Sequence, residues 1–276
     1  MNNIINNILI KSKIQKRNLY FSIMLFILLL FFFYIQSDIL GIFSLVIVTF
    51  ITFYYSIKYK SLATILYVAL GLRLVTILLG NSIIILPDSW GDATAFELRA
   101  WEWSQNDIIE HLNNFPSNDR SYFLSWLLAF VYKFSDRSLI MGQSISLLFA
   151  MGSILLAIRI ANKIWNESIS VKFGWILALY PTLILYSCLI LRESYIWFFL
   201  LVGVYGAVCW LEDKRIKSLI ISFSGFYFAT LFHGGMFIGG LFFLIIVGIL
   251  SMIDILNKIV NLKISKKSLS ILLFSV

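Results

Sequence analysis

The sequence predicts an all-α, polytopic integral membrane protein with about eight transmembrane helices and with interfacial helices in its first large outer loop. Of its 276 residues, 60% are apolar and only 13% are charged, whereas soluble domains are about 45–50% apolar and about 25% charged. Apolar runs of about 20 residues, the length that crosses a bilayer, alternate with short charged clusters. The runs are apolar on every face and lack the alternation of a β-barrel strand. These observations exclude a soluble globular protein and favour helical spans.

Eight apolar runs are interpreted as membrane spans within a single transmembrane domain that covers residues 1–276. The first run follows basic residues, like the start of a signal peptide, but no small-residue cleavage site comes after it, so we expect it to be retained. A further run, Tyr122–Phe134, is too short to cross and is expected to be interfacial or re-entrant. The eight spans are Leu19–Ile35, Ile39–Ile57, Leu62–Leu86, Leu139–Ala157, Val171–Ile190, Tyr195–Leu211, Ser218–Phe232 and Met236–Met252.

Lys and Arg residues gather on the cytoplasmic side of membrane proteins, and this rule gives the orientation. With a cytoplasmic N-terminus and no crossing by Tyr122–Phe134, 16 of the 22 basic residues lie inside. The same topology makes residues 87–138 an extracytoplasmic loop. We therefore predict a multi-pass protein of the cell (cytoplasmic) membrane whose longest polar segment is on the outer face. The net charge of +8 marks this orientation and does not predict a nucleic-acid partner.

The longest polar stretch of the chain, residues 87–120, contains the first candidate site residues. Asp92 precedes a helix-compatible run, so its carboxylate either caps that helix or acts as a general base above the bilayer. Asp88 has the same two interpretations. Trp90 and Trp101 either stack on the apolar face of a sugar ring or lie, as Trp commonly does, at the membrane interface.

A second acidic point lies between two long apolar runs, at Arg192 and Glu193. A solvated hairpin tip explains these charges, but a charged pair at the edge of the hydrocarbon is costly enough to indicate a function. Pro181, about eleven residues earlier, is expected to kink the preceding helix and to aim this tip toward the protein centre.

Arg73 and His233 are the other unusual residues near the apolar runs. Arg73 lies near the middle of a predicted span, where a charge is costly, so it should face the bundle interior. Its partner is a carboxylate, a set of helix carbonyls or an anionic lipid phosphate. His233 stands at a short hairpin tip, either as a polar turn residue or as part of a site, whereas His111 is expected to be solvated. Gly235 and Gly239 have the small-xxx-small spacing of close helix packing.

Three stretches of the chain, considered together, resemble one family. The first is Arg73 followed by the acidic loop SWGDATAFELRAWEWS, and the second is the apolar segment SYFLSWLLAFVYKF with the basic-ended helix after it. The third, WILALYPTLILYSCLILRESYIWFF, has a proline and then an acidic residue. Over residues 70–237 this pattern is similar to that of the polyprenyl-phosphate-dependent membrane glycosyltransferases of the GT-C superfamily, which include bacterial lipopolysaccharide and arabinose transferases.

The resemblance implies a sugar transfer on the outer face of the membrane. The donor would be a polyprenyl-phosphate-linked sugar, the acceptor a glycan, lipid or protein of the cell envelope, and membrane lipids the other partners. Asp92 matches the catalytic base of the family, and Glu193 matches its second acidic position, which orients substrate or binds a divalent cation together with Asp92. Arg192 or Arg73 would stabilise the leaving phosphate. The residues expected to bind substrate are Asp88, Arg73, Arg192, His233, Trp90 and Trp101.

The chain also departs from the family pattern. Two helices precede the one that carries Arg73, and the sequence stops before the further helices of many members, so we expect either a truncated chain or an unusual end. The His233 region resembles polysaccharide polymerases of similar architecture equally well. Two other functions stay open: a transporter of lipid-linked saccharide and a non-catalytic assembly subunit. A transporter would need a polar path across the membrane, and Arg73 is nearly the only charge within the spans.

Overall fold

The computed structural model describes residues 20–27, 30, 38–113 and 122–260. All regular secondary structure in these ranges is helical, which confirms the all-α class. The labelled helices are α2 (Ile39–Lys58), α3 (Ala63–Ser82), α4 (Asp92–Ser104), α5 (Ile108–Asn113), α6 (Phe123–Ser135), α7 (Leu139–Ile164), α8 (Glu167–Leu179), α9 (Pro181–Ser187), α10 (Glu193–Asp213), α11 (Ile216–Phe232) and α12 (Met236–Val260).

Five of the helices in the described ranges are long and apolar enough to cross a membrane, or six if the bent pair α8 and α9 counts as one span. This supports a multi-pass membrane protein but does not reproduce all eight expected spans. The run predicted at Leu19–Ile35 lies mostly outside the described residues, α11 has only 17 residues, and the run predicted at Val171–Ile190 is broken in two. The apolar helix α6 has 13 residues and is too short to cross, as expected.

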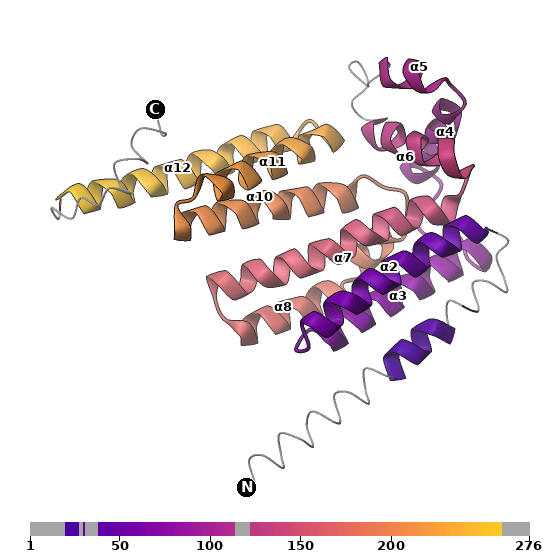
Figure 1. Cartoon of the computed structure of the whole chain (residues 1–276), viewed down its shortest axis with the longest axis horizontal. Coiled ribbons are helices and arrows are strands. Elements are labelled where there is room, and N and C mark those ends of the chain that lie inside the picture. The colour runs from indigo at the N-terminus through magenta and orange to yellow at the C-terminus, as the bar shows by residue number, and fades with distance from the viewer. Residues whose placement is uncertain (1–19, 28–29, 31–37, 114–121, 261–276) are drawn as a thin grey trace, which may run out of the picture.

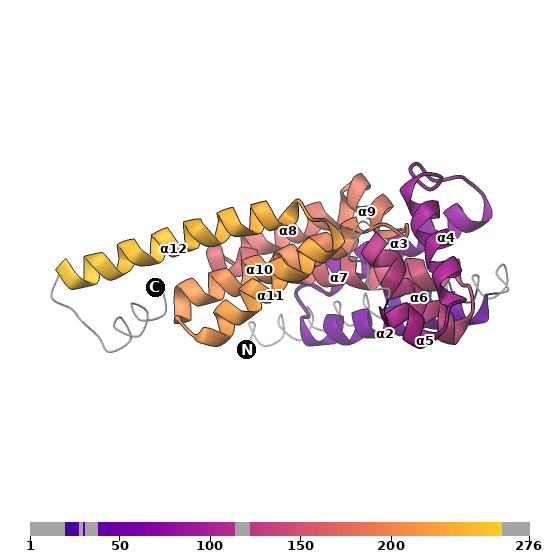
Figure 2. The ribbon, with the colours of Figure 1, turned by 90° about the horizontal axis from the view of Figure 1, so that it is seen from above.

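The helices form an elongated bundle with a helical cap at one end (Figures 1 and 2). α4, α5 and α6 make up this cap, and α2, α7 and α10 each begin at the cap end. The opposite end carries basic clusters: Lys58 ends α2, Lys163 lies in the last turn of α7, and Lys214 follows α10. The basic residues and the acidic loop thus lie at opposite ends of the bundle. The predicted orientation depends on this separation.

α3 is the most buried of the five long apolar helices among the described residues. In its apolar window 61% of the residues are buried, against 17–50% in the other four helices. α3 packs against α2, α7, α8 and α9, and its side chains Leu66, Leu70 and Leu74 belong to the apolar core. A charge on this helix therefore lies inside the protein, and Arg73 is only 1% exposed.

Arg73 binds the carbonyl groups at the break between α8 and α9. Pro181 begins α9 and has no N–H, so the carbonyl of Leu177 loses the partner that it would have in a continuous helix, and the two helices are bent by 61°. The Arg73 guanidinium donates to the Leu177 carbonyl at 3.4 Å and to the Ala178 carbonyl at 3.2 Å. It also donates to the carbonyl of Ala69, in its own helix, at 3.0 Å. The sequence left three kinds of partner open for Arg73, and in the structure its partners are helix carbonyls.

The break redirects the chain toward the cap end. After the short α9, residues 188–191 are non-helical and buried. The Cys188 thiol donates to the backbone carbonyl of Arg73 at 3.3 Å, and α10 then begins at Glu193. The kink expected at Pro181 is confirmed, and Arg73 contacts the chain both before and after it.

The most extensive helix contact in the described chain joins α10 and α11. It depends on glycines other than the two that the small-xxx-small spacing indicated. A Cβ on Gly206 would lie 2.4 Å from the backbone of α11, and a Cβ on Gly225 would lie 2.2 Å from the backbone of α10. The close packing expected at Gly235 and Gly239 is wrong, because a Cβ at either position would meet no other helix.

Replacing Arg73 by Met should destabilise the protein by at least about 2 kcal/mol, because two carbonyls lose their donor where no water replaces it. In a Pro181→Ala background, residue 181 has an N–H for Leu177, so the cost of Arg73→Met should fall by about 1 kcal/mol. Unfolding of the four proteins in detergent, followed by circular dichroism, measures this coupling. Additive effects of the two substitutions would contradict the role of Arg73 at the break.

Candidate functional site

A pocket of about 740 Å³ opens at the cap end, between the loop that joins α3 to α4 and the start of α10. Three carboxylates line it: Asp88, Asp92 and, about 100 residues later in the chain, Glu193. Trp90 of the loop and Tyr186 of α9 line it as well. We call this the carboxylate pocket. It joins the two acidic segments that the sequence identified separately.

The loop between α3 and α4 contains a turn with one residue in the left-handed conformation. Asp88 has a φ of 61°, a value that Asp adopts more readily than most residues other than glycine. Two hydroxyl groups hold the turn: Ser89 Oγ donates to the Leu86 carbonyl at 2.7 Å, and Thr94 Oγ1 donates to the Ser89 carbonyl at 2.6 Å. These bonds fix the entry into α4 and thus the position of Asp92.

Asp92 is the first residue of α4, and Gly91 occupies the N-cap position. The Asp92 side chain is exposed and accepts no hydrogen bond from the residues that the structure describes. Its carboxylate lies at the N-terminus of α4. The pocket therefore contains an ionisable oxygen that is not engaged in capping.

Asp88 is linked to the other side of the pocket. The Tyr186 hydroxyl donates to Asp88 Oδ2 at 3.3 Å, so the loop before α4 contacts α9. Because α9 follows the break at Pro181, the bend that Arg73 stabilises also determines where Tyr186 lies.

Glu193 is the first residue of α10. Its Oε2 atom is buried and has no hydrogen-bond partner among the described residues. The neighbouring Arg192 does not neutralise it: the guanidinium lies 5.6 Å from the ring centroid of Phe96 in α4 and forms no ion pair within the described ranges. Glu193 thus lines the pocket, whereas Arg192 is not among its lining residues.

The remaining predicted site residues lie apart from this pocket. Arg73 is buried among helix carbonyls, as described above. Trp101 packs into the cap, with its ring 6.4 Å from that of Tyr132. His233 is exposed and ends α11, and it does not line the pocket. Of the aromatic candidates only Trp90, which is 76% exposed, lies in it.

Sequence reasoning missed Tyr186 and misplaced His111. Tyr186 is one aromatic residue within an apolar run, and only the nearby Pro181 distinguishes it. His111 is 6% exposed: its Nε2 lies 3.0 Å from the Trp126 carbonyl, and the Trp126 indole donates to the His111 carbonyl at 3.0 Å. The expectation that His111 is solvated was wrong because Trp126 and Phe130 of α6, the next helix along the chain, pack against its ring.

An ion pair attaches the cap to the bundle. Arg137 Nε donates to Glu97 Oε1 at 2.9 Å, and an Arg137 terminal nitrogen donates to Oε2 at 2.7 Å. The side chain of Glu97 is 6% exposed and that of Arg137 is 45% exposed. The hydrogen bond to Glu97 raises the pKa of Arg137, so the arginine stays charged. Because Glu97 belongs to α4 and Arg137 precedes α7, the pair holds the two helices together.

A divalent cation shared by Asp92 and Glu193 stays a prediction. Within the described residues, no three His, Cys, Asp or Glu side chains are grouped to hold a metal ion. Asp92 and Glu193 would contribute carboxylate oxygens, and a substrate phosphate and water would complete the shell, as is common for Mg²⁺.

Comparisons with protein-family models, with curated proteins and with solved structures gave no match to this chain. The functional interpretation therefore depends on two arguments. One is the geometry of the carboxylate pocket, and the other is the family resemblance of the three sequence stretches.

Replacing Arg137 by Met should lower the free energy of unfolding by roughly 2–3 kcal/mol. Breaking a fully buried pair costs about 3–5 kcal/mol, and the loss is smaller here because Arg137 is partly exposed. The matched control is Arg99→Met on the same cap, where the partner Glu102 lies 3.9 Å away and is exposed. That change should cost about 1 kcal/mol or less. Thermal unfolding in detergent compares the two, and equal losses would show that Arg137 does not hold the cap.

Proposed function

We propose that the protein is a membrane glycosyltransferase of the GT-C type. It transfers a sugar from a polyprenyl-phosphate-linked donor to a glycan, lipid or protein acceptor of the cell envelope. The observation that carries the proposal is that Asp92 and Glu193, which match the acidic positions of the family, line one pocket although they are about 100 residues apart. The pocket lies at the end of the bundle opposite the basic clusters. The positive-inside rule assigns that end to the outer face of the cell membrane.

The transfer needs a base for the acceptor and a stabilising charge for the leaving group. Asp92 takes the proton of the acceptor hydroxyl, the acceptor oxygen bonds to the anomeric carbon from the opposite face, and the bond from that carbon to the phosphate oxygen breaks. The polyprenyl phosphate leaves with the bonding electron pair, so the configuration is inverted. Arg192, which has no ion-pair partner within the described chain, stabilises this phosphate with a permanent charge.

The other residues of the pocket have supporting roles. Glu193 orients the acceptor or shares a divalent cation with Asp92. Asp88, which accepts a hydrogen bond from Tyr186, and the exposed ring of Trp90 contact the sugars. Arg73 supports the site indirectly, through the helix break.

Asp92→Asn should lower transfer by about 100-fold or more, because general-base catalysis contributes about 10²–10⁴-fold. The glycosylated polyprenyl phosphate should then accumulate on the protein. Mass spectrometry of the lipids that co-purify in mild detergent, from the parent and the variant, detects this unreacted donor and identifies the sugar.

The matched control is Asp107→Asn, an exposed acid of the same cap outside the pocket, which should behave like the parent. Near-full transfer by Asp92→Asn would show that Asp92 is not the base. Ordinary phospholipid alone, in the parent and in the variant, would favour a non-catalytic assembly subunit.

Asp88 allows a test that separates function from folding. Its φ of 61° suits glycine, which offsets the loss of the long, exposed hydrogen bond from Tyr186, so Asp88→Gly should leave the melting temperature nearly unchanged. Transfer should fall about tenfold, because the sugar loses its hydrogen bond to the Asp88 carboxylate, and a hydrogen bond to a charged group contributes about 1.5–3 kcal/mol. Asp136 has a φ of 60° outside the pocket, and Asp136→Gly is therefore the control. Equal transfer by the two variants would remove Asp88 from the site.

A further inference from the structure

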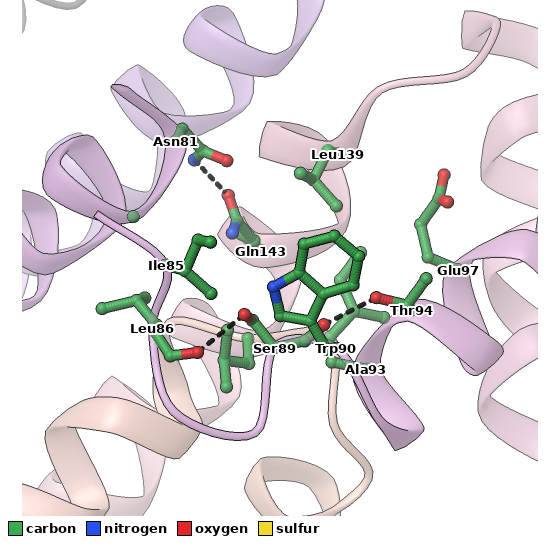
Figure 3. A pocket seen from close by; sticks show the side chains of 13 residues that line it. Asn81, Ile85, Leu86, Ser89, Trp90, Ala93, Thr94, Glu97, Leu139 and Gln143 are labelled. Atoms are coloured by element: carbon green, nitrogen blue, oxygen red, sulfur yellow. Dashed lines mark hydrogen bonds between the residues drawn. The ribbon is translucent and has the colours of Figure 1, made fainter. Parts of the chain in front are cut away.

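A second pocket, of about 300 Å³, lies against the same loop (Figure 3). It shares Ile85, Leu86 and Trp90 with the carboxylate pocket, so the loop forms a wall of both. Residues of α3, α4 and α7 complete it, among them the amide side chains of Asn81 and Gln143. We call it the amide pocket, and the sequence analysis did not identify any part of it except Trp90.

The hydrogen bonds of Asn81 determine which way both amides point. Asn81 Nδ2 donates to the Ile77 carbonyl at 3.0 Å and to Gln143 Oε1 at 2.7 Å. A carbonyl only accepts, so the Asn81 nitrogen must face Ile77, and Gln143 must then present its oxygen. Gln143 Nε2 and Asn81 Oδ1 have no partner among the described residues. Gln143 is 4% exposed, and in Figure 3 its nitrogen lies on the side of the amide away from Asn81.

The amide pocket carries no unpaired charge. Among the described residues that line it, Glu97 is the charged one, and both of its oxygens accept hydrogen bonds from Arg137. In Figure 3 the Glu97 carboxylate points away from Trp90. A phosphate or an ammonium group would therefore find no counter-charge here. A neutral ligand would find a double donor, an acceptor and a large apolar ring.

We propose that the amide pocket binds a neutral saccharide unit. Sugar hydroxyls both donate and accept, so they pair with Gln143 Nε2 and Asn81 Oδ1, while the apolar C–H face of the ring packs on Trp90. A volume of about 300 Å³ is at the lower end of the range for ligand pockets and suits one sugar ring. Because the loop is shared, this unit belongs to the acceptor, a step that rests on the proposed function.

The test is the binding of methyl glycosides of the common hexoses and pentoses to the purified protein. A sugar-free detergent, such as an amine oxide, avoids competition, and saturation-transfer NMR measures the affinity. The parent should bind at least one glycoside, and both Gln143→Glu and Trp90→Ala should weaken that binding about tenfold. Gln143→Glu keeps the acceptor for Asn81 and replaces the Nε2 donor by a carboxylate oxygen, which only accepts. Trp165→Ala is the matched control: this tryptophan is 60% exposed and follows the far end of α7, so binding should not change.

The outcomes separate this proposal from the transferase. Absence of binding to the parent, or parental affinity in both Gln143→Glu and Trp90→Ala, would overturn the amide pocket as a saccharide site. Trp90→Ala changes an exposed side chain, so its result stands even where Gln143→Glu unfolds. Asp92→Asn should lose transfer and keep its affinity for the glycoside. Gln143-dependent glycoside binding without any transfer would support the amide pocket and refute the proposed function.

Discussion

One buried guanidinium determines the arrangement of the candidate site. Arg73, in the middle of the most buried of the long helices described, donates to carbonyls at the break that Pro181 causes. In a bilayer no water replaces such a donor, so without this arginine the carbonyls of Leu177 and Ala178 would lose the donor that they have at the break. The break lets α9 turn by 61° and lets the following segment reach the cap end, where Tyr186 and Glu193 line the carboxylate pocket. A charge in the core thus supplies hydrogen bonds at the bend after which two distant segments meet.

The loop between α3 and α4 lies between two packed parts of the molecule. On one side the Glu97–Arg137 pair joins α4 to the start of α7, and on the other α3 is anchored in the core. The loop itself has an exposed Trp90 and is held by a few hydroxyl bonds. Functional residues commonly lie on such loops, which a rigid scaffold positions. Since the loop forms a wall of both pockets, a movement of Trp90 would change both of them together.

Local sequence properties predicted the class of the protein and part of the site. Composition indicates a helical membrane protein, and the missing N–H of Pro181 predicts the bend. Glu193 stands out as a charge between two apolar runs, and Asp92 by its place before a helix-compatible run and by the family resemblance. The partners of Arg73 and the burial of His111 were not predictable, because they depend on segments 105 and 15 residues away. The pairing of Asn81 with Gln143 spans 62 residues, and no periodicity encodes it. The number of spans stayed open for a related reason, since packing decides whether a run is straight or broken.

The distribution of paired and unpaired groups separates structural residues from those available to a ligand. Arg73 and Glu97 are buried, and each makes at least two hydrogen bonds, as the cost of isolated buried charge requires. Glu193 has a buried carboxylate oxygen without a partner in the described chain. The exposed carboxylate of Asp92 accepts no hydrogen bond from the described residues either. Bond breaking needs preorganised charges that no other group occupies, whereas recognition of a neutral sugar needs free donors and acceptors without charge. The carboxylate pocket meets the first requirement and the amide pocket meets the second, on a single shared loop.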